Sequence, residues 1–401
     1  MLFMSKGVTI MQVFDKAFQH LERPFAWLDM QALDTNIKFI NQRVRDKKVR
    51  IATKSIRSIQ VLNYIYEKLE NVSGFMTFTA SETCYLLENG FDHLLIGYPV
   101  WEENSVLPIF DYIKKGYDVC FMIDDVRQAK WLNALAKREN LEISICIDIN
   151  LSIESSIIYF GTRRSSIKTI KVLKELLDSL QKLSHLQING VMGYEAQLAG
   201  VGDVPIQKWK RPIIQQLQKR SRKQVAKFRN EAVDTILSVT GELEFVNGGG
   251  SGSIDFTSQC PEVTEITVGS AFFNPALFDQ YSALNLRPAA GFALRITRNP
   301  EENVVVCHGG GYIASGAISI DKQPVLYEKG KFEYFSLEGA GEVQTPLKVI
   351  TKETLKLGDT LYFRHAKAGE LCERFTKLEA VRNGQHINSF KTYRGDGQCF
   401  L

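Results

Sequence analysis

Residues 47–58 read KKVRIATKSIRS and contain the first predicted strand of the chain. The apolar run Val49–Ala52 predicts a short buried strand, and the turn-prone Ser55 follows it. Lys54 stands where this strand ends. A lysine in such a position is most often a solvated cation, so the elements around it decide whether it has a functional role.

Further runs of the same kind recur between about residue 24 and residue 275, and amphipathic helical segments separate them. The runs after Val49–Ala52 are Gly74–Phe78, His93–Ile96, Asp118–Ile123, Glu142–Asp148, Gln187–Met192, Glu244–Val246 and Glu265–Val268. Helices are expected over 58–70, over 81–90 with Ser81 as N-cap and Gly90 as stop, over 124–140 and over 206–239. Eight strand–helix units predict an α/β protein with a TIM-like (β/α)8 barrel.

The pattern changes after about residue 280, where long helical periods end. Short alternating segments such as GFALRITR (291–298) and DTLYFRHA (359–366) follow, broken by Gly and Asp turns, and they predict a mostly antiparallel β domain. We therefore divide the chain into an N-terminal segment (1–24) that packs near the β domain, a barrel (25–278) and a C-terminal β domain (279–401).

Composition narrows the class of protein. The chain has 401 residues, 44% of them hydrophobic and 23% charged, as in a globular protein with a large core. The net charge of +4 does not indicate nucleic acid by itself. The one strongly basic stretch, 208–229, is better explained as the solvated face of a helix than as a tract that binds phosphate backbone.

Cysteine usage and the chain start indicate the compartment. The seven cysteines are odd in number and form no CxxC pair, which predicts reduced thiols and not a disulfide framework. The N-terminus lacks the pattern of a signal peptide, and no apolar run reaches the roughly 18 residues of a membrane span. We expect a cytoplasmic protein with neither nucleic acid nor membrane as partner.

Glycine and serine cluster after the seventh and eighth predicted strands. NGGGSGS (247–253) contains Gly249, Gly250 and Ser251, and VGSAFF (268–273) contains Gly269 and Ser270. In barrels of this kind the active site lies at the carboxyl ends of the strands, and phosphate often binds after strands seven and eight. Each cluster alone could be a flexible turn, but together they predict a phosphate site.

A lysine and a phosphate cradle on one barrel face suit a pyridoxal 5′-phosphate (PLP) enzyme. Lys54 would form the Schiff base with the cofactor, and Tyr194 after strand six would point into the barrel mouth. Arg163 or Arg164 after strand five could face the ring nitrogen and weaken the ring as an electron sink. The alternatives are a rim cation for Lys54, a structural tyrosine and two exposed arginines.

Two further candidate residues lie in the β domain. His365 and Cys372 in FRHAKAGELCERF are side chains that suit zinc. Two ligands do not make a site, and their spacing matches no zinc-finger pattern, so a buried histidine and a buried thiol are the alternative.

The order of these motifs resembles a known family. ATKS after strand one, GYEAQ after strand six, the glycine loop after strand seven, GSAFFNPALFD after strand eight and RHAKAGELCERF are similar to the alanine-racemase-type (fold type III) PLP enzymes. The resemblance covers nearly the whole chain and is closest to the D-threonine aldolase and D-serine dehydratase branch.

The resemblance implies a role for each candidate. Lys54 matches the Schiff-base lysine, and Tyr194 matches a tyrosine near the cofactor. Arg163 lies near the position of an arginine that faces the ring nitrogen. The glycine and serine positions match the phosphate loops: Gly249, Gly250, Ser251, Gly269 and Ser270. His365 matches a histidine that binds a divalent metal (zinc, manganese or similar), and the metal holds the substrate β-hydroxyl.

The sequence departs from the family in two places. The second metal ligand is expected two residues after the histidine, as Cys or Asp, but Lys367 stands there, and Cys372 could replace it only if the intervening residues loop out. The lysine motif is not the KANAYG of the racemases, and no segment like GR-x-x-MD is present.

These features predict a PLP-dependent lyase acting on D-3-hydroxy amino acids of the D-threonine or D-serine type, by retro-aldol cleavage or by dehydration. Lys54, Tyr194 and His365 are the expected catalytic residues, and His365 and Cys372 the expected metal ligands. The alternatives are a PLP-dependent amino-acid racemase and a non-catalytic PLP carrier. The resemblance also implies a homodimer.

Overall fold

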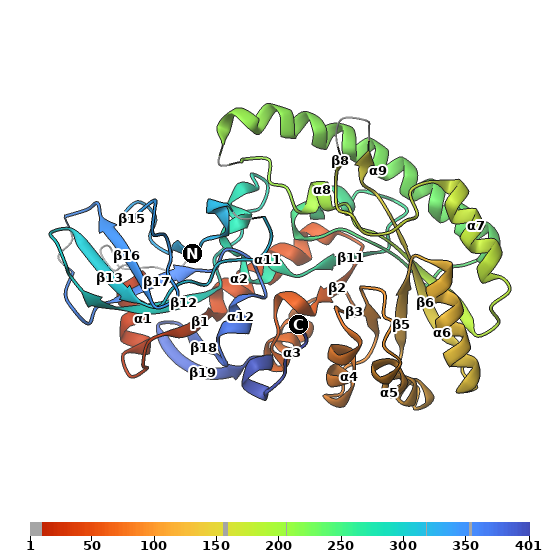
Figure 1. Ribbon diagram of the computed structural model, residues 1–401, viewed down its shortest axis with the longest axis horizontal. Helices are drawn as coiled ribbons and strands as arrows, with labels where there is room; N and C mark the ends of the chain where they lie inside the picture. The colour runs from red at the N-terminus through yellow and green to blue at the C-terminus, as the bar shows by residue number, and fades with distance from the viewer. Residues whose placement is uncertain (1–9, 155–158, 206, 318, 353–354) are drawn as a thin grey trace.

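The structure of the protein is a computed structural model that describes residues 10–154, 159–205, 207–317, 319–352 and 355–401. It consists of a parallel barrel surrounded by helices and, beside it, a separate β sheet (Figure 1). Within the described ranges, no helix is both long and apolar enough to cross a bilayer. All seven cysteines lie in these ranges as free thiols.

Eight parallel strands close the barrel in the order β10-β11-β2-β3-β4-β5-β6-β9. Each of the eight predicted strands is present, with ends that shift by two residues or fewer. The strands are β2 (Lys48–Ala52), β3 (Val72–Thr77), β4 (Leu94–Ile96), β5 (Val119–Ile123), β6 (Ile143–Ile149), β9 (Leu186–Gly193), β10 (Phe245–Gly248) and β11 (Glu265–Val268). Their continuous apolar runs reflect burial on both faces, because helices cover the outside and side chains fill the inside.

A charged pair lies inside the barrel. Arg50 on β2 and Glu265 on β11 form two hydrogen bonds of 2.6 Å and 2.9 Å, both with buried side chains. The guanidinium also lies over the ring of Phe245 and donates to the carbonyl oxygens of Phe75 and His93. These contacts satisfy a cation that would otherwise be costly to bury.

Helices follow the strands around the barrel (Figure 1). They are α2 (Met30–Val44), α3 (Ile59–Lys68), α4 (Ala80–Glu88), α5 (Glu103–Lys114), α6 (Val126–Arg138), α7 (Ile170–Leu180), α8 (Ala196–Ala199), α9 (Arg211–Thr240), α10 (Ile254–Thr257) and α11 (Ser270–Phe273). The prediction of Ser81 as N-cap was wrong: Thr79 caps α4 by accepting from the backbone N–H of Glu82. Thr79 and Glu82 have the spacing of a capping box, which the sequence contained.

The β sheet has nine strands and takes one of them from the N-terminal part of the chain. β1 (Phe25–Asp29) lies between β12, to which it is antiparallel, and β18, to which it is parallel. The range 25–278, assigned to the barrel from sequence, therefore begins with a strand of the other sheet. The remaining strands are β12 (Ala290–Arg298), β13 (Val304–His308), β14 (Val325–Leu326), β15 (Phe332–Tyr334), β16 (Gln344–Val349), β17 (Thr360–Arg364), β18 (Lys377–Arg382) and β19 (Gln385–Lys391).

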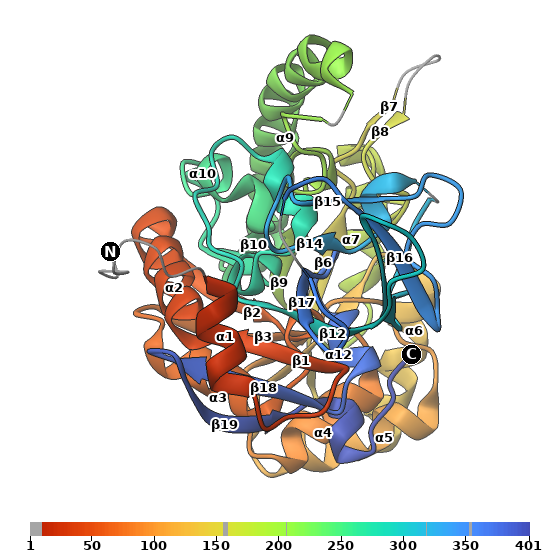
Figure 2. The same ribbon diagram turned by 90° about the vertical axis from the view of Figure 1, so that its left-hand side faces the viewer.

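The first described helix packs against this sheet. α1 (Ile10–Phe18) places Phe14 and Phe18 in a buried cluster with Phe25 and Trp27 of β1 and Tyr362 of β17. Figure 2 shows α1 beside β1 and β18. Aromatic side chains of this size bury large apolar areas, so the cluster ties the N-terminal part of the chain to the β domain.

Candidate active site

A cavity of about 130 Å³ lies at the carboxyl ends of the barrel strands. Residues after six of the strands line it, as expected for a functional site in this architecture. The predicted site residues that line it are Lys54, Tyr194, Gly249, Gly250, Ser251, Gly269 and Ser270. The sequence pattern therefore located the mouth of the barrel and seven of the residues that line this cavity.

Lys54 reaches this cavity from the short turn Thr53–Ser55 that follows β2. Its Nζ donates a hydrogen bond of 3.0 Å to the hydroxyl oxygen of Tyr98, a residue just after β4. The Lys54 cation is the main cause that lowers the pKa of the Tyr98 hydroxyl, and Arg164 adds to the effect while burial opposes it. The sequence reasoning missed Tyr98, which lies in an irregular stretch, IGYPV, without a recognisable motif.

The adjacent side chains of Arg163 and Arg164 lie in different environments. Arg164 lines the cavity, with its guanidinium 5.6 Å from the ring centre of Tyr98 and 5.7 Å from that of Tyr194. Arg163 is exposed and lies over the ring of Tyr159 instead, at 4.3 Å. The structure thus brings Arg164, not Arg163, to the position expected for a residue beside the cofactor ring.

Asp148 holds Arg164 in place. Its Oδ2 accepts from Arg164 Nε at 2.7 Å, and the carbonyl of Gly97 accepts from Nη2 at 3.3 Å. Burial raises the pKa of Asp148 to about 6, although Arg164 opposes this shift. Asp148 comes from the end of β6, so two neighbouring segments of the chain form a charged pair at the mouth.

The glycines of the two loops are required by close packing. Gly249 has φ +86°, and a Cβ there would lie 2.7 Å from Ile266 Cγ2. A Cβ on Gly250 would meet Ala199 Cβ at 2.9 Å, and one on Gly269 would meet Ser55 Oγ at 2.5 Å. The loops can therefore bring their backbone close to a ligand in a way that larger residues would prevent.

Ser251 joins the two loops. Its Oγ accepts hydrogen bonds from the backbone N–H groups of Ala271 at 2.9 Å and Gly269 at 3.4 Å. The hydroxyl predicted to bind phosphate thus also connects the loop after β10 to the loop after β11. The clusters therefore form one joined part of the cavity lining, in which the hydroxyl groups of Ser251 and Ser270 can donate to an anion.

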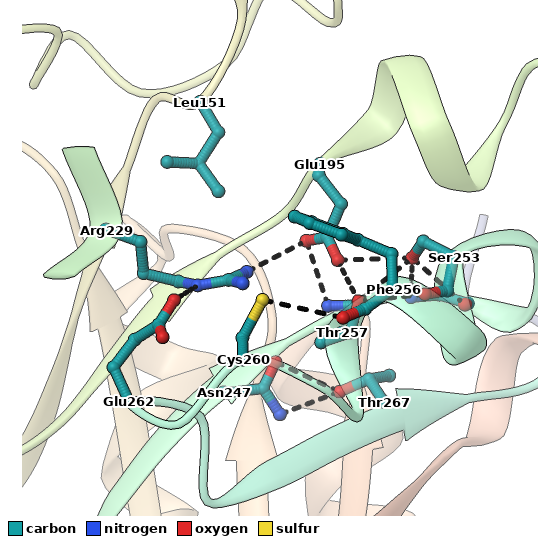
Figure 3. Close-up of polar contacts among 12 residues, drawn as sticks. Leu151, Glu195, Arg229, Asn247, Ser253, Phe256, Thr257, Cys260, Glu262 and Thr267 are labelled. Atoms are coloured by element: carbon teal, nitrogen blue, oxygen red, sulfur yellow. Dashed lines mark hydrogen bonds and ion pairs between the residues drawn. The ribbon is translucent and has the colours of Figure 1, made fainter. Parts of the chain in front are cut away.

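A buried carboxylate supports the first loop from behind (Figure 3). Glu195, fully buried, accepts from the backbone N–H of Gly249 at 3.0 Å, from Ser253 Oγ at 3.2 Å and from Thr257 Oγ1. Arg229 of α9 donates to the same carboxylate at 3.3 Å and to Glu262 at 2.9 Å. The sequence analysis assigned no role to either residue. Glu195 lies within the GYEAQ motif, from which we selected only the tyrosine, and Arg229 lies in the basic stretch 208–229, which we interpreted as a solvated helix face.

Tyr194 extends from the end of β9 into the cavity and borders Gly250, whose added Cβ would lie 3.2 Å from the tyrosine ring. Burial is the main cause that raises the pKa of its hydroxyl to about 12, with Glu195 adding to the effect. The hydroxyl therefore stays protonated at neutral pH and is available as a hydrogen-bond donor.

The two metal candidates lie away from this cavity. His365 is buried against Phe273, with ring centres 6.4 Å apart, and borders a separate void of about 10 Å³. Burial, with a further effect of Arg364, lowers the pKa of His365 to about 3, so the imidazole is neutral. Cys372 is also buried, which raises the pKa of its thiol to about 12. Neither residue lines the cavity at the strand ends.

A second, larger cavity of about 880 Å³ adjoins the first and shares Lys54, Tyr194 and Ser270 with it. Side chains of the β domain, Lys367 and Glu370 among them, form part of its wall. A small, closely lined cavity at the strand ends and a larger one beside it could accommodate a cofactor and a substrate in contact with the same lysine.

Comparison with known proteins agrees with this arrangement. The family model described as "Alanine racemase, N-terminal domain" matches residues 28–275. The chain belongs to this family. The alanine racemase N-terminal domain thus spans the barrel and its strand-end loops, including Lys54 and both glycine clusters.

The sequence identity to individual relatives is low. The chain is 24% identical over 258 residues to the 3-hydroxy-D-aspartate aldolase of Paracoccus denitrificans, a match that covers 64% of this chain and 61% of that relative's length. The D-threonine aldolase of Filomicrobium marinum has a similar fold, with a TM-score of 0.79, 16% identity and coverage of 93% and 95% of the two chains. The D-threo-3-hydroxyaspartate dehydratase of Delftia sp. HT23 also has a similar fold, with a TM-score of 0.77 and 15% identity. The match covers 94% of this chain and 98% of that chain.

The residues at the mouth fit PLP. Lys54 offers an amine to the aldehyde, and the joined glycine loops offer space and the hydroxyl groups of Ser251 and Ser270 to the phosphate. The guanidinium of Arg164, 5.6 Å and 5.7 Å from the ring centres of Tyr98 and Tyr194, would lie beside the ring. Both ring nitrogens of His365 are buried without a hydrogen-bond partner, but the residues around them offer too few further ligands to fit a divalent metal. No group of three or more His, Cys, Asp or Glu residues that could hold a metal occurs in the described parts of the chain.

Proposed function

We propose that the protein is a PLP-dependent lyase that acts on D-3-hydroxy amino acids. The observation that supports this most is the position of Lys54, which lines both the small cavity with its glycine loops and the large cavity beside it. Bound PLP supplies an electron sink that stabilises negative charge at the carbon atoms next to the substrate nitrogen. The names of the relatives, aldolases and a dehydratase, support the substrate class.

Different residues of the chain would bind the cofactor, support its binding loop and transfer protons. The joined loops around Gly250 and Ser251 would bind the phosphate and fix the cofactor, and Glu195 would hold the first loop in shape. Lys54 would bind the cofactor and then be free to move a proton at the substrate α-carbon. Tyr98, in hydrogen-bond contact with Lys54 Nζ, would orient this amine and exchange a proton with it.

Two reactions are open to such a site. In retro-aldol cleavage the β-hydroxyl loses its proton and the Cα–Cβ bond breaks, so that D-threonine yields glycine and acetaldehyde. In dehydration Lys54 removes the α-proton and the β-hydroxyl leaves as water, so that D-threonine yields ammonia and 2-oxobutanoate after hydrolysis. The volume of about 880 Å³ beside Lys54 supports a catalyst over a PLP carrier, because a carrier has no need of a substrate cavity.

Product analysis tests the proposal. The purified, PLP-loaded protein is incubated with D-threonine, D-serine and 3-hydroxy-D-aspartate, and the products are identified. We expect either glycine with an aldehyde or ammonia with a 2-oxo acid, and neither product with Lys54→Ala. L-configured amino acid as the product would instead support racemisation, and no turnover of any of the three would contradict the lyase proposal.

The homodimer, the cytoplasmic location and the division at residues 24 and 278 stay predictions. Measurement of the molecular mass in solution tests the homodimer. Limited proteolysis between the barrel and the β domain tests the domain division.

A further inference from the structure

Lys367 is a cation fixed in the wall of the large cavity that also contains Lys54 and Tyr194. Its Nζ donates to Ser315 Oγ at 3.0 Å, and a carboxylate oxygen of Glu370 lies 4.0 Å away. Glu370 holds Ser315 in turn, because both of its oxygens accept from the Ser315 backbone N–H at 2.9 Å and one accepts from the hydroxyl. Lys367 is therefore oriented by two partners while its side chain stays half exposed and lines the large cavity.

The surroundings of His365 oppose a divalent metal. The small void beside the imidazole is lined by Lys367 and Arg374, two cations, and by one carboxylate, that of Glu370. That carboxylate already accepts hydrogen bonds from Ser315. A divalent ion would thus meet one imidazole and a shared carboxylate together with two positive charges, which is a poor ligand set.

Both proposed reactions need positive charge or an acid at the β-oxygen of the substrate. In dehydration the Cβ–O bond breaks with its electron pair on oxygen, and a proton must reach this oxygen to release water. In cleavage the oxygen carries negative charge once the hydroxyl has lost its proton, and a hydrogen-bond donor stabilises that charge. A metal ion or an ammonium group can serve either purpose.

We propose that Lys367, and not a metal ion at His365, acts on the β-oxygen of the substrate, so that the reaction is independent of metal. This inference rests on the proposed function and names a further catalytic residue for it. In dehydration the Lys367 ammonium gives its proton to the departing oxygen, Lys54 takes the α-proton, and exchange with solvent restores both lysines. In cleavage a water molecule takes the β-hydroxyl proton, and Lys367 keeps its own proton and donates a hydrogen bond to the oxygen. Lys54 then gives a proton to the α-carbon after the Cα–Cβ bond has broken, and solvent restores the protons on both groups.

Metal content is the first test. The PLP-loaded protein, purified without chelator, is analysed by inductively coupled plasma mass spectrometry, and its thermal unfolding is followed with added Mn²⁺, Zn²⁺ or EDTA. We expect far less than one metal ion per chain, an unchanged unfolding temperature and turnover that EDTA does not reduce. A stoichiometric metal ion that is lost in His365→Gln, and whose removal lowers turnover or stability, would overturn the inference.

Substitution of Lys367 is the second test. We expect Lys367→Gln to lower kcat by about 100-fold with little change in KM, unfolding temperature or the absorbance of bound PLP. Lys367→Arg should retain part of the activity, and added methylamine should partly restore Lys367→Ala, whereas added metal should not. Lys377→Gln, which removes an exposed lysine of β18 in the same domain, serves as the matched control and should be unchanged.

The two proposals fail in different ways. Full activity of Lys367→Gln would overturn the role of Lys367 while leaving the lyase intact. An inactive wild type on every D-3-hydroxy amino acid would overturn the proposed function and the role of Lys367 with it, and the metal analysis would still decide whether His365 holds an ion.

Discussion

At the scale of single residues, Arg163 and Arg164 show that the sequence alone does not predict which of two adjacent side chains lines the cavity. Arg163 and Arg164 are adjacent in an irregular loop after β6, yet Arg164 lines the cavity and Arg163 does not. The resemblance favoured Arg163, but Arg164 has a charged partner, Asp148, at the end of β6. Which arginine faces inward depends on this contact, and the contact exists only in the folded chain.

Exchange of each arginine for methionine tests this difference. We expect Arg164→Met to weaken PLP binding by about 10- to 100-fold. The substitution removes the charge-assisted hydrogen bond between Arg164 and Asp148 and leaves the Asp148 carboxylate without its cation. Arg163→Met, the matched control on the exposed side, should change the affinity less than twofold. Fluorescence titration of the apoprotein with PLP measures both, and equal effects of the two variants would contradict the assignment.

At the scale of elements, the loop after β10 depends on a carboxylate from the turn after β9 and an arginine from α9. The sequence reasoning predicted both loops and the helix but not their connection. The residues of α9 alternate between exposed basic side chains and a buried face, and Arg229 belongs to the buried face. Charge counting along a helix does not reveal such an exception, because burial depends on what packs against the helix.

Glu195→Gln tests the connection. The substitution keeps the shape of the side chain but removes its charge, which leaves Arg229 buried with Glu262 as its one remaining carboxylate. We expect the free energy of unfolding to fall by about 3 kcal/mol and PLP to bind more weakly. Urea denaturation measures the first effect and fluorescence titration the second.

Glu231→Gln is the matched control for this experiment. Glu231 lies on α9 as well, but its pair with Lys227, at 3.8 Å, is exposed. This variant should lose no more than about 0.5 kcal/mol. If Glu195→Gln were as mild as Glu231→Gln, the buried network would have no role in holding the loop.

At the scale of the whole molecule, the C-terminal segment returns to the barrel. The fully buried Tyr393 donates its hydroxyl to Glu82 of α4 at 3.0 Å, and its backbone N–H donates to the carbonyl of Arg57 at 2.8 Å. Tyr85 of α4 donates to Asp396 at 2.9 Å. Segments more than 300 positions apart in sequence therefore contact one another near the turn that carries Lys54.

The pH dependence of stability reports on this contact. Burial raises the pKa of Glu82 from 4.5 to about 7, against the opposing hydrogen bonds from Thr53, Phe78 and Tyr393 and the charge of Arg57. The folded protein thus binds a proton that the unfolded chain releases between these two pH values. Stability from this group increases as pH falls through this window and is lost as pH rises above about 7.

Glu82→Gln should remove this dependence. Because each pKa unit corresponds to about 1.4 kcal/mol, the wild type should gain on the order of 3 kcal/mol relative to the variant between pH 8 and pH 4.5. Chemical denaturation of both proteins across this range gives the difference, in which carboxyl groups common to both proteins cancel. A difference that does not vary with pH would show that the pKa of Glu82 is the same in the folded protein as in the unfolded chain.

The sequence alone determined the alternating strands and helices, because burial on both sides of a parallel strand demands a continuous apolar run that is visible in one dimension. It also determined that Lys54 and the two glycine clusters follow strands of the same barrel, which places them at one end of it. Side-chain partners were decided by the tertiary structure: Tyr98 for Lys54, Asp148 for Arg164 and Glu195 for Gly249. The location of β1 in the second sheet was decided in the same way. Local patterns specify what a segment can become, whereas each of these contacts joins different elements of the fold and depends on distances that only close packing of the whole molecule sets.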